Sequence, residues 1–294
     1  MTVSAVAAKA ADRAGPGVDA VRDLPSSFDP LTVAAIDARL ADIQRAQGVT
    51  IPLAIESGSR AWGFPSPDSD YDCRFVFVRP THQYLSPWQS RDVIETPLEG
   101  DLDVNGWELG KAIKLVLKGN AVIIEWLSSP IVYGGDAPFR QAILDLAARH
   151  ARRDLIGRHY LHLGDRQRRV HFGEGKQVAQ KKIFYAMRAA AALRWLRLRP
   201  DKAIVPMHFP TLIAECEAPG DVLALAEDLR ARKAVTRELG DTALPEPIAR
   251  FIDDEFEAAR VAFARVPVTV SAEAKKDADA FFQATVARLD RFAG

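Results

Sequence analysis

The sequence predicts an α+β protein in which a small mixed β-sheet is followed by an all-helical region. Short runs of strand length lie between residues 51 and 105, and long segments with helical spacing of apolar residues fill the chain after residue 106. With 294 residues, 48% of them hydrophobic, the chain is long enough for two cores. We expect a poorly ordered lead-in at residues 1–24, a sheet domain over 25–149 and a helical domain over 150–294.

The sheet region begins with a helix over residues 25–49. Asp29 suits the N-cap, Pro30 suits the first helical position, and Gly48 suits the end of the helix. A short apolar strand follows, and the Gly-, Ser- and Pro-rich residues 58–69 form a loop with at most one helical turn.

Three further segments carry strand signals. Residues 71–78 are β-branched and aromatic, residues 91–96 are a second candidate, and residues 101–105 alternate so that Asp101 and Asp103 share one face. After these strands we expect a short extended piece at 131–133 and helices at 109–118, 121–127, 138–150, 151–171, 175–199, 208–217, 221–239, 248–263 and 272–292.

Several classes of protein are excluded by composition. The most apolar runs, such as residues 75–78, are far shorter than the ~20 residues of a membrane-spanning helix. Charged residues interrupt the Ala-rich start, so it does not resemble a signal peptide. Cys73 and Cys216 match no metal-binding spacing. We expect a protein of the reducing cytoplasm that is not in the membrane.

Charge is unevenly distributed along a chain that is neutral overall, with 39 basic and 39 acidic residues. Residues 140–199 hold 15 Lys and Arg against four acids, whereas residues 211–260 hold 12 acids against six bases. Such a basic segment attracts polyanions, for example nucleic acid or a triphosphate. The alternative is a solvated surface whose charge is offset by the acidic segment folding beside it. Together with the motif described next, the pattern favours phosphate binding.

The most informative segment joins the first strand to residues 71–78. The first strand leads to Gly58-Ser59, and ten residues later Asp70 and Asp72 open the next strand on one face. Their like charges repel, and a Mg²⁺ ion, which takes one or two carboxylates plus substrate phosphates, removes that repulsion. The Gly-Ser turn offers backbone N–H groups and a hydroxyl to phosphates, and Gly58 permits close approach. Each part alone is common, but together they predict a metal–triphosphate clamp.

This pattern resembles the signature of the DNA polymerase β-like nucleotidyltransferase superfamily, carried here by Ser57-Gly58-Ser59 and Asp70-Tyr71-Asp72-Cys73. Residues 58–63 and 69–75 are similar to the RlaP branch, the RNA-repair-pathway nucleotidyltransferases associated with RNA ligase. The segments 105–111, 119–130 and 181–188 also resemble that branch, so that the resemblance covers roughly residues 50–200.

The resemblance implies a palm-like sheet with a third metal-binding carboxylate on a later strand. We favour Asp103 because it lies in mid-strand, with Asp101 as second choice and Glu108 as third; the alternative is that Asp101 and Asp103 belong to a turn after Gly100. The expected cofactor is Mg²⁺, with Mn²⁺ as an alternative. Asp70 and Asp72 would hold two ions, and Asp103 would complete the ligands of one of them.

The resemblance also implies that an NTP such as ATP is the substrate and that pyrophosphate leaves. Ser59 and neighbouring N–H groups would hold the β- and γ-phosphates. Arg60 would add positive charge at the leaving group, unless it is a solvent-facing loop residue.

A helical face within the basic segment is a further candidate for nucleotide binding. Lys181, Tyr185 and Arg188 recur at i, i+4 and i+7. The resemblance implies that Lys181 or Lys182 and Arg188 contact phosphates and that Tyr185 lies near the base or sugar. The alternative is amphipathic packing, with the cationic groups reaching water. Glu125 would support the sheet–helix junction.

The expected function is therefore metal-dependent transfer of NMP from an NTP to a hydroxyl, at an RNA 3′ end during repair. RNA as a partner and a functional link to an RNA ligase follow from the resemblance and the basic segment. One rival keeps the chemistry but uses a protein or small-molecule acceptor. The other is a catalytically idle RNA-binding or scaffold protein, which the intact carboxylates argue against.

Overall fold

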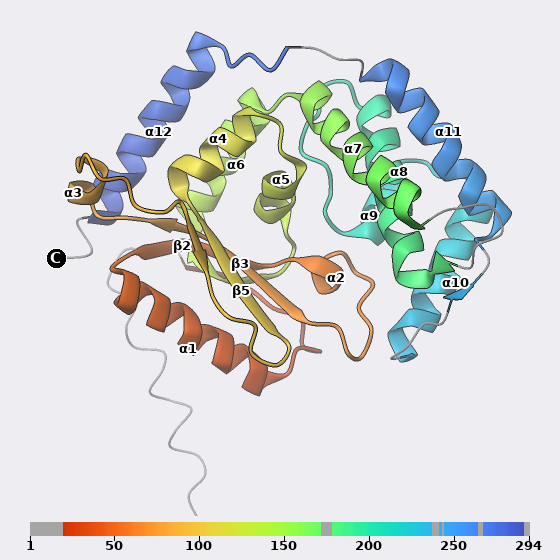
Figure 1. Cartoon of the computed structure of the whole chain (residues 1–294), viewed down its shortest axis with the longest axis horizontal. Coiled ribbons are helices and arrows are strands. Elements are labelled where there is room, and N and C mark those ends of the chain that lie inside the picture. The colour runs from red at the N-terminus through yellow and green to blue at the C-terminus, as the bar shows by residue number, and fades with distance from the viewer. Residues whose placement is uncertain (1–19, 172–177, 237–240, 243, 264–266, 291–294) are drawn as a thin grey trace, which may run out of the picture.

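The computed structural model describes residues 20–171, 178–236, 241–242, 244–263 and 267–290. Within these residues a mixed six-stranded sheet lies beneath an arch of helices (Figure 1). This arrangement confirms the predicted α+β class. None of the described helices has both the length and the apolar content needed to cross a membrane.

The sheet has the strand order β1-β6-β2-β3-β5-β4. Only β3 and β5 pair in parallel, and all other pairs are antiparallel. The strands are β1 (Ala20–Asp23), β2 (Thr50–Glu56), β3 (Tyr71–Val78), β4 (Val93–Glu95), β5 (Leu102–Glu108) and β6 (Val132–Asp136).

The first strand departs from the sequence prediction. Residues 20–23 belong to the predicted lead-in, yet they pair with β6 at the sheet edge. This strand has only four residues and three of them are exposed, so no period-2 apolar pattern marks it. Residues 1–19 lie outside the described part of the chain.

One face of the sheet is covered by α1 (Pro30–Gln47), which buries Ile36 and Leu40. The predicted caps are confirmed. The Asp29 side chain accepts hydrogen bonds from two backbone N–H groups of the first turn, and Gly48 ends the helix at φ 58°. The helix begins five residues later than predicted because Asp29 itself is extended.

The opposite face is covered by α4 (Leu109–Leu117), α5 (Ala121–Ser128) and α6 (Ala137–His150) (Figure 1). The last helix, α12 (Ala272–Asp290), returns to this region and packs on α4 and α6. The Arg288 side chain also pairs with Asp136, the N-cap of α6. The chain is therefore not divided cleanly at residue 150, because its C-terminal helix packs on the elements of the first half.

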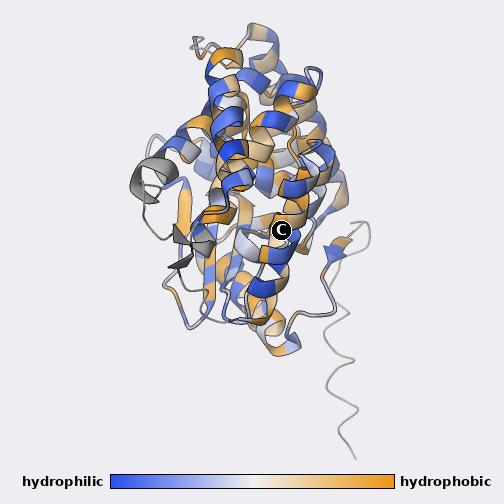
Figure 2. Ribbon diagram, turned by 90° about the vertical axis from the view of Figure 1, so that its right-hand side faces the viewer, coloured by the Kyte–Doolittle hydropathy of each residue, from blue (hydrophilic) through white to orange (hydrophobic). Residues whose placement is uncertain are grey.

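The remaining helices continue the same hydrophobic core. Phe64, in the loop after β2, stacks on Phe184 of α8 with ring centroids 4.6 Å apart, which links the sheet region to the helical region. Figure 2 shows hydrophobic residues along the strands and a mixture of hydrophobic and hydrophilic residues along the helices. The other elements are α2 (Gly58–Ala61), α3 (Thr81–Tyr84), α7 (Arg153–His171), β7 (Val178–Ala179), α8 (Gln180–Leu198), α9 (Phe209–Glu215), α10 (Gly220–Val235), β8 (Asp241–Thr242) and α11 (Glu246–Ala262).

Candidate active site

The Gly-Ser turn lies directly against one of the predicted carboxylates. Gly58 starts the single turn of α2 at φ 61°, and a Cβ atom at this position would lie 1.9 Å from Asp72 Oδ2. The backbone N–H of Ser57 donates to the Asp72 carbonyl at 2.8 Å. Only glycine therefore allows the turn and the Asp72 carboxylate to approach each other so closely.

Asp72 and Asp103 are brought together by the parallel pairing of β3 and β5. The two residues are register partners, so their side chains lie next to each other on one face of the sheet. Arg74 Nη2 donates to Asp72 Oδ1 at 3.0 Å and to Asp103 Oδ2 at 2.6 Å, and Nη1 donates to the Asp103 carbonyl at 2.8 Å. One guanidinium thus compensates both carboxylates.

Asp70 lies just before β3 and is exposed. The loop that carries it is held by Arg60, which donates to the carbonyls of Ser69 at 2.6 Å and Asp70 at 3.1 Å. The Arg60 guanidinium also lies 3.8 Å from the centroid of the Tyr71 ring. In this arrangement Arg60 positions the Asp70 loop.

A buried carboxyl that the sequence prediction gave no role, Glu56, supports the same site. Its Oε1 accepts from the Asp72 backbone N–H at 3.0 Å, and its Oε2 accepts from the Tyr133 hydroxyl at 2.5 Å. Burial, more than the nearby negative charge of Asp72, raises the pKa of Glu56 to about 8. An uncharged carboxyl is therefore favoured next to the backbone of Asp72.

The two reserve candidates for the third carboxylate lie differently. Glu108 is at the far end of β5, five residues or about 17 Å from Asp103. It caps α4 by accepting from the N–H groups of Gly110 and Lys111. Asp101 is exposed and precedes β5. The geometry thus favours Asp103 as the partner of Asp72.

The start of α8 faces this site. The pKa of Tyr185 is raised, first by burial and next by the negative charge of Asp72, with a smaller contribution from Asp70. The Lys182 ammonium lies 5.6 Å from the centroid of the Tyr185 ring. Tyr185 and Lys182 therefore lie on the side of α8 that borders the carboxylates. The side chain of Lys181 lies outside the described part of the chain.

Arg188, predicted to contact phosphates, is engaged in an internal network instead. It pairs with buried Glu125, which also accepts from the Tyr160 hydroxyl at 2.8 Å and from the Trp62 indole at 3.3 Å. The Arg188 guanidinium lies 4.1 Å from the centroid of the Trp62 ring. Its expected phosphate contact stays a prediction, whereas the supporting role expected of Glu125 agrees with these contacts.

Part of the basic segment is neutralised internally, as the alternative interpretation of the charge pattern expected. Arg194 and Arg197 of α8 both pair with Glu255 of α11, which belongs to the acidic segment. A link of the opposite polarity joins Arg260 of α11 to Asp165 of α7, and it does not reduce the positive charge of the basic segment. A phosphate-binding role for the whole segment is therefore not required to explain its charge.

Asp72 and Asp103 are the residues best placed to hold a metal ion. They already share one cation, the Arg74 guanidinium, so their arrangement fits a positive charge. Among the described residues no three His, Cys, Asp or Glu side chains form one metal-binding cluster. A site completed by Asp70 thus stays a prediction.

Sequence signals for the two unpredicted residues were present. Arg74 lies two positions after Asp72, so strand alternation places both on one face. Glu56 is an acidic residue that closes an otherwise apolar strand immediately before the Gly-Ser turn. What the sequence does not contain is the pairing of β3 with β5, which brings Arg74 to Asp103.

Two comparisons with known proteins bear on this site. Residues 33–284 match the model of RlaP, described as the RNA repair pathway DNA polymerase beta family. An uncharacterized protein of Bacillus subtilis (strain 168), YcgL, is 39% identical over 215 residues, which cover 73% of this chain and 82% of that protein. The matched range contains the Gly-Ser turn, the carboxylates and α8.

Proposed function

Because the chain belongs to the RNA repair pathway DNA polymerase beta family, in which a polymerase beta-like nucleotidyltransferase is expected, we propose that it transfers NMP from an NTP to the 3′ hydroxyl of RNA. The observation that best supports this is the convergence of three elements. The Gly58 turn, Asp72 on β3 and Asp103 on β5 meet at one point of the sheet.

In this proposal Asp72 and Asp103, together with Asp70, would hold Mg²⁺ or Mn²⁺. When bound, such ions activate the acceptor hydroxyl and stabilise the charge of the in-line displacement at the α-phosphorus. With such an ion bound, the carboxylates of Asp72 and Asp103 would no longer need the Arg74 guanidinium as their counter-charge. Ser59 and the backbone of its turn bind the β- and γ-phosphates of the NTP.

The face of α8 completes the nucleotide site. The Tyr185 ring offers a flat surface for the base or sugar, and the Lys182 ammonium offers charge to the phosphates. The buried pair of Arg188 and Glu125 positions this face through Trp62, which follows directly on α2. The Trp62 side chain contacts both members of the pair, and its ring centroid lies 5.6 Å from that of Tyr185. The link to an RNA ligase stays a prediction.

Label transfer tests the proposal. The protein is incubated with each α-labelled NTP and Mg²⁺, with and without RNA that has a free 3′ hydroxyl, and the label is followed. We expect label on RNA, and its loss in Asp103→Asn but not in the matched variant Asp101→Asn. Label on protein or on a small molecule, with RNA unlabelled, would refute the RNA acceptor. Absence of transfer with every NTP would refute the proposed nucleotidyltransferase activity.

A further inference from the structure

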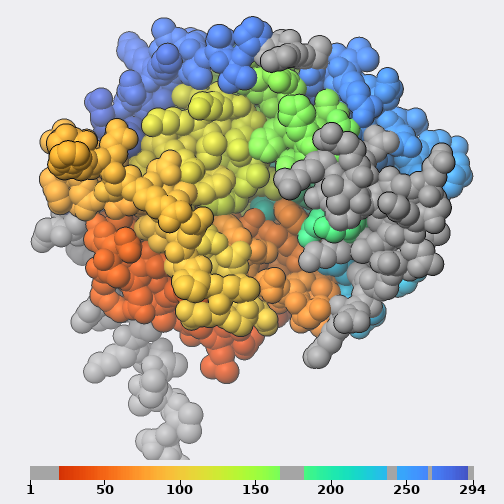
Figure 3. All heavy atoms as spheres, in the orientation of Figure 1, coloured from red at the N-terminus to blue at the C-terminus, as the bar shows by residue number. Residues whose placement is uncertain are grey.

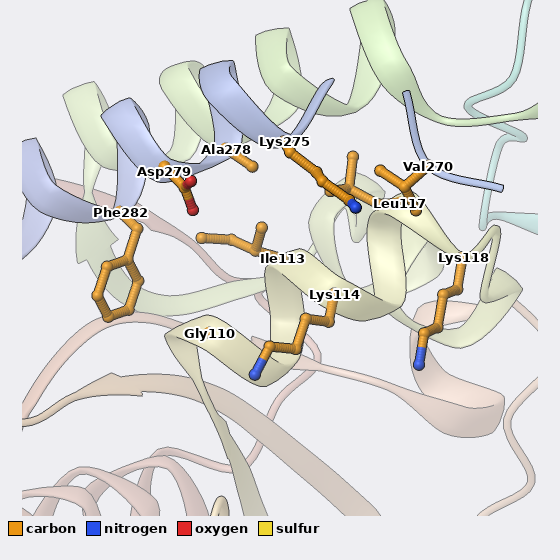
Figure 4. A pocket seen from close by; sticks show the side chains of 10 residues that line it. All are labelled: Gly110, Ile113, Lys114, Leu117, Lys118, Val270, Lys275, Ala278, Asp279 and Phe282. Atoms are coloured by element: carbon orange, nitrogen blue, oxygen red, sulfur yellow. The ribbon is translucent and has the colours of Figure 1, made fainter. Parts of the chain in front are cut away.

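A separate groove lies between α4 and α12, away from the carboxylates. It encloses a cavity of about 420 Å³ whose floor is apolar, formed by Ile113, Leu117 and Phe282 among others. Figure 4 shows Lys275 extending from α12 toward α4, on which Lys114 lies. Lys118, at the end of α4, lines the same cavity.

A second cavity, of about 380 Å³, adjoins the first. It lies between the α4–α5 turn and the first half of α7, and Arg158 and His162 are among its lining residues. Lys118 lines both cavities, so they are direct neighbours, and we call the two together the basic groove. In Figure 3 α4, α7 and α12 are visible on one face of the molecule.

The charge of the basic groove is strongly positive. Four cationic side chains line it, and Asp279 is the one acid among its lining residues. The cationic set is Lys114, Lys118, Arg158 and Lys275. Burial lowers the pKa of His159, which lines the second cavity, so this imidazole stays neutral at pH 7.

An exposed aromatic residue follows in sequence on α3, the helix that contacts the α12 end of the groove. Tyr84 of α3 packs edge-on against Phe282 with ring centroids 5.0 Å apart, and Phe282 lines the first cavity. Trp88 follows four residues later, which is at most about 14 Å of extended chain. Its side chain is 84% exposed. An exposed indole within this reach of a cationic groove suits a stacking platform for nucleic-acid bases.

We propose that the basic groove binds the single-stranded portion of the RNA acceptor, upstream of its reacting 3′ end. Several cationic side chains along one groove suit backbone phosphates, and an apolar floor with an exposed tryptophan within reach suits the faces of bases. The proposal rests on the proposed function only for the identity of the acceptor as RNA. The groove serves affinity for long acceptors and takes no part in the chemistry.

Fluorescence anisotropy with labelled single-stranded RNA tests the groove, in EDTA and without NTP, so that no transfer step enters the measurement. The groove variant is Lys118→Gln with Lys275→Gln. The matched control is Lys202→Gln with Lys276→Gln, which removes two exposed lysines outside the groove, one of them adjacent to Lys275 on α12.

For a 16-nucleotide RNA in 0.1 M salt we expect the groove variant to bind about 25-fold more weakly, at about 5-fold for each lost phosphate contact. The slope of log K against log salt should become shallower by about 1.4. The control should stay within twofold of the wild type.

The Trp88 contact has its own pair of variants. Trp88→Ala should weaken binding of the 16-nucleotide RNA at least 5-fold, since loss of one stacked base costs about 1–3 kcal/mol. Leu85→Ala, at a neighbour that is 80% exposed but has no ring, should not. Equal effects of the two substitutions on RNA affinity would show that Trp88 is not part of the RNA-binding surface.

Equal RNA affinity of the groove variant and its control would refute the proposal that the groove binds RNA. A wild-type protein that binds no RNA would refute it as well. Failure of NMP transfer with every acceptor is a separate result. It would refute the proposed enzyme and leave these affinities unchanged.

Discussion

Gly58→Ala should inactivate the enzyme because of one short contact. At φ 61° an L-residue costs about 1–2 kcal/mol of stability. The added Cβ would also lie 1.9 Å from Asp72 Oδ2, whereas real Cβ atoms stay about 3 Å or more from such atoms. The Asp72 carboxylate must therefore withdraw by about 1 Å, and a displacement of that size costs about 100-fold in rate.

Gly100→Ala separates the two effects of this substitution. Gly100 has φ 58°, but a Cβ atom there has nothing within 4 Å. We expect it to lose the same 1–2 kcal/mol of stability and to keep its activity. Gly48→Ala, at the end of α1, is a second control with the same φ and open space.

Urea denaturation would measure the free energy of unfolding of the three variants, and label transfer at saturating and limiting NTP would measure their activity. The expected result is three similar losses of stability and a loss of transfer only in Gly58→Ala. Transfer at the wild-type rate in a folded Gly58→Ala protein would refute the close approach of turn and carboxylate. Equal loss of transfer in all three variants would show that activity follows stability.

Three more predictions concern charges at the site. Arg74→Met should lower the melting temperature in EDTA because Asp72 and Asp103 then repel each other, and Mg²⁺ should restore it more than in the wild type; an unchanged melting temperature in EDTA would contradict the role of Arg74. Glu56→Gln should remove one pH dependence. The folded-state pKa of Glu56, about 8, lies above the ordinary 4.5, so the contribution of this group to stability is fully present below pH 4.5 and is lost as the pH rises to about 8, by a few kcal/mol. Urea melts at pH 5 and pH 8.5 check this, and the same slope in both proteins would contradict it. Asp70→Asn should abolish transfer and leave the stability unchanged or slightly higher, since Asp70 is exposed and lies near Asp72; transfer near the wild-type rate would show that Asp70 is not a ligand.

The secondary structure was predictable where apolar periodicity was long or caps were explicit. The helix that ends at Gly48 and the strand from Tyr71 to Val78 were predicted from such signals and are confirmed. The edge strand β1 was missed because four mostly exposed residues carry no period. Its place in the sheet depends on pairing with β6, more than 100 residues away.

The candidate site was predictable in its local parts and not in its pairings. Alternation placed Asp101 and Asp103 on one face, and the register of β3 with β5 explains why Asp103 meets Asp72. Arg188 was predicted to contact phosphates from helical spacing together with the family resemblance. Spacing does not reveal that Glu125, 63 residues earlier, holds the guanidinium in the interior.

The position of α12 has a consequence for synthesis of the protein on the ribosome. The sheet and α4–α6 are complete by residue 150, but the helix that packs on α4 and α6 begins at Ala272, and Arg288 must reach Asp136 across 152 residues. The ribosome adds about 5–20 residues per second, so the apolar side of α4 and α6 stays uncovered for on the order of ten seconds until α12 has been synthesised. A nascent chain halted before residue 272 would present that surface to chaperones and proteases, so truncated products of this gene are expected to be removed rather than to accumulate as a free sheet domain.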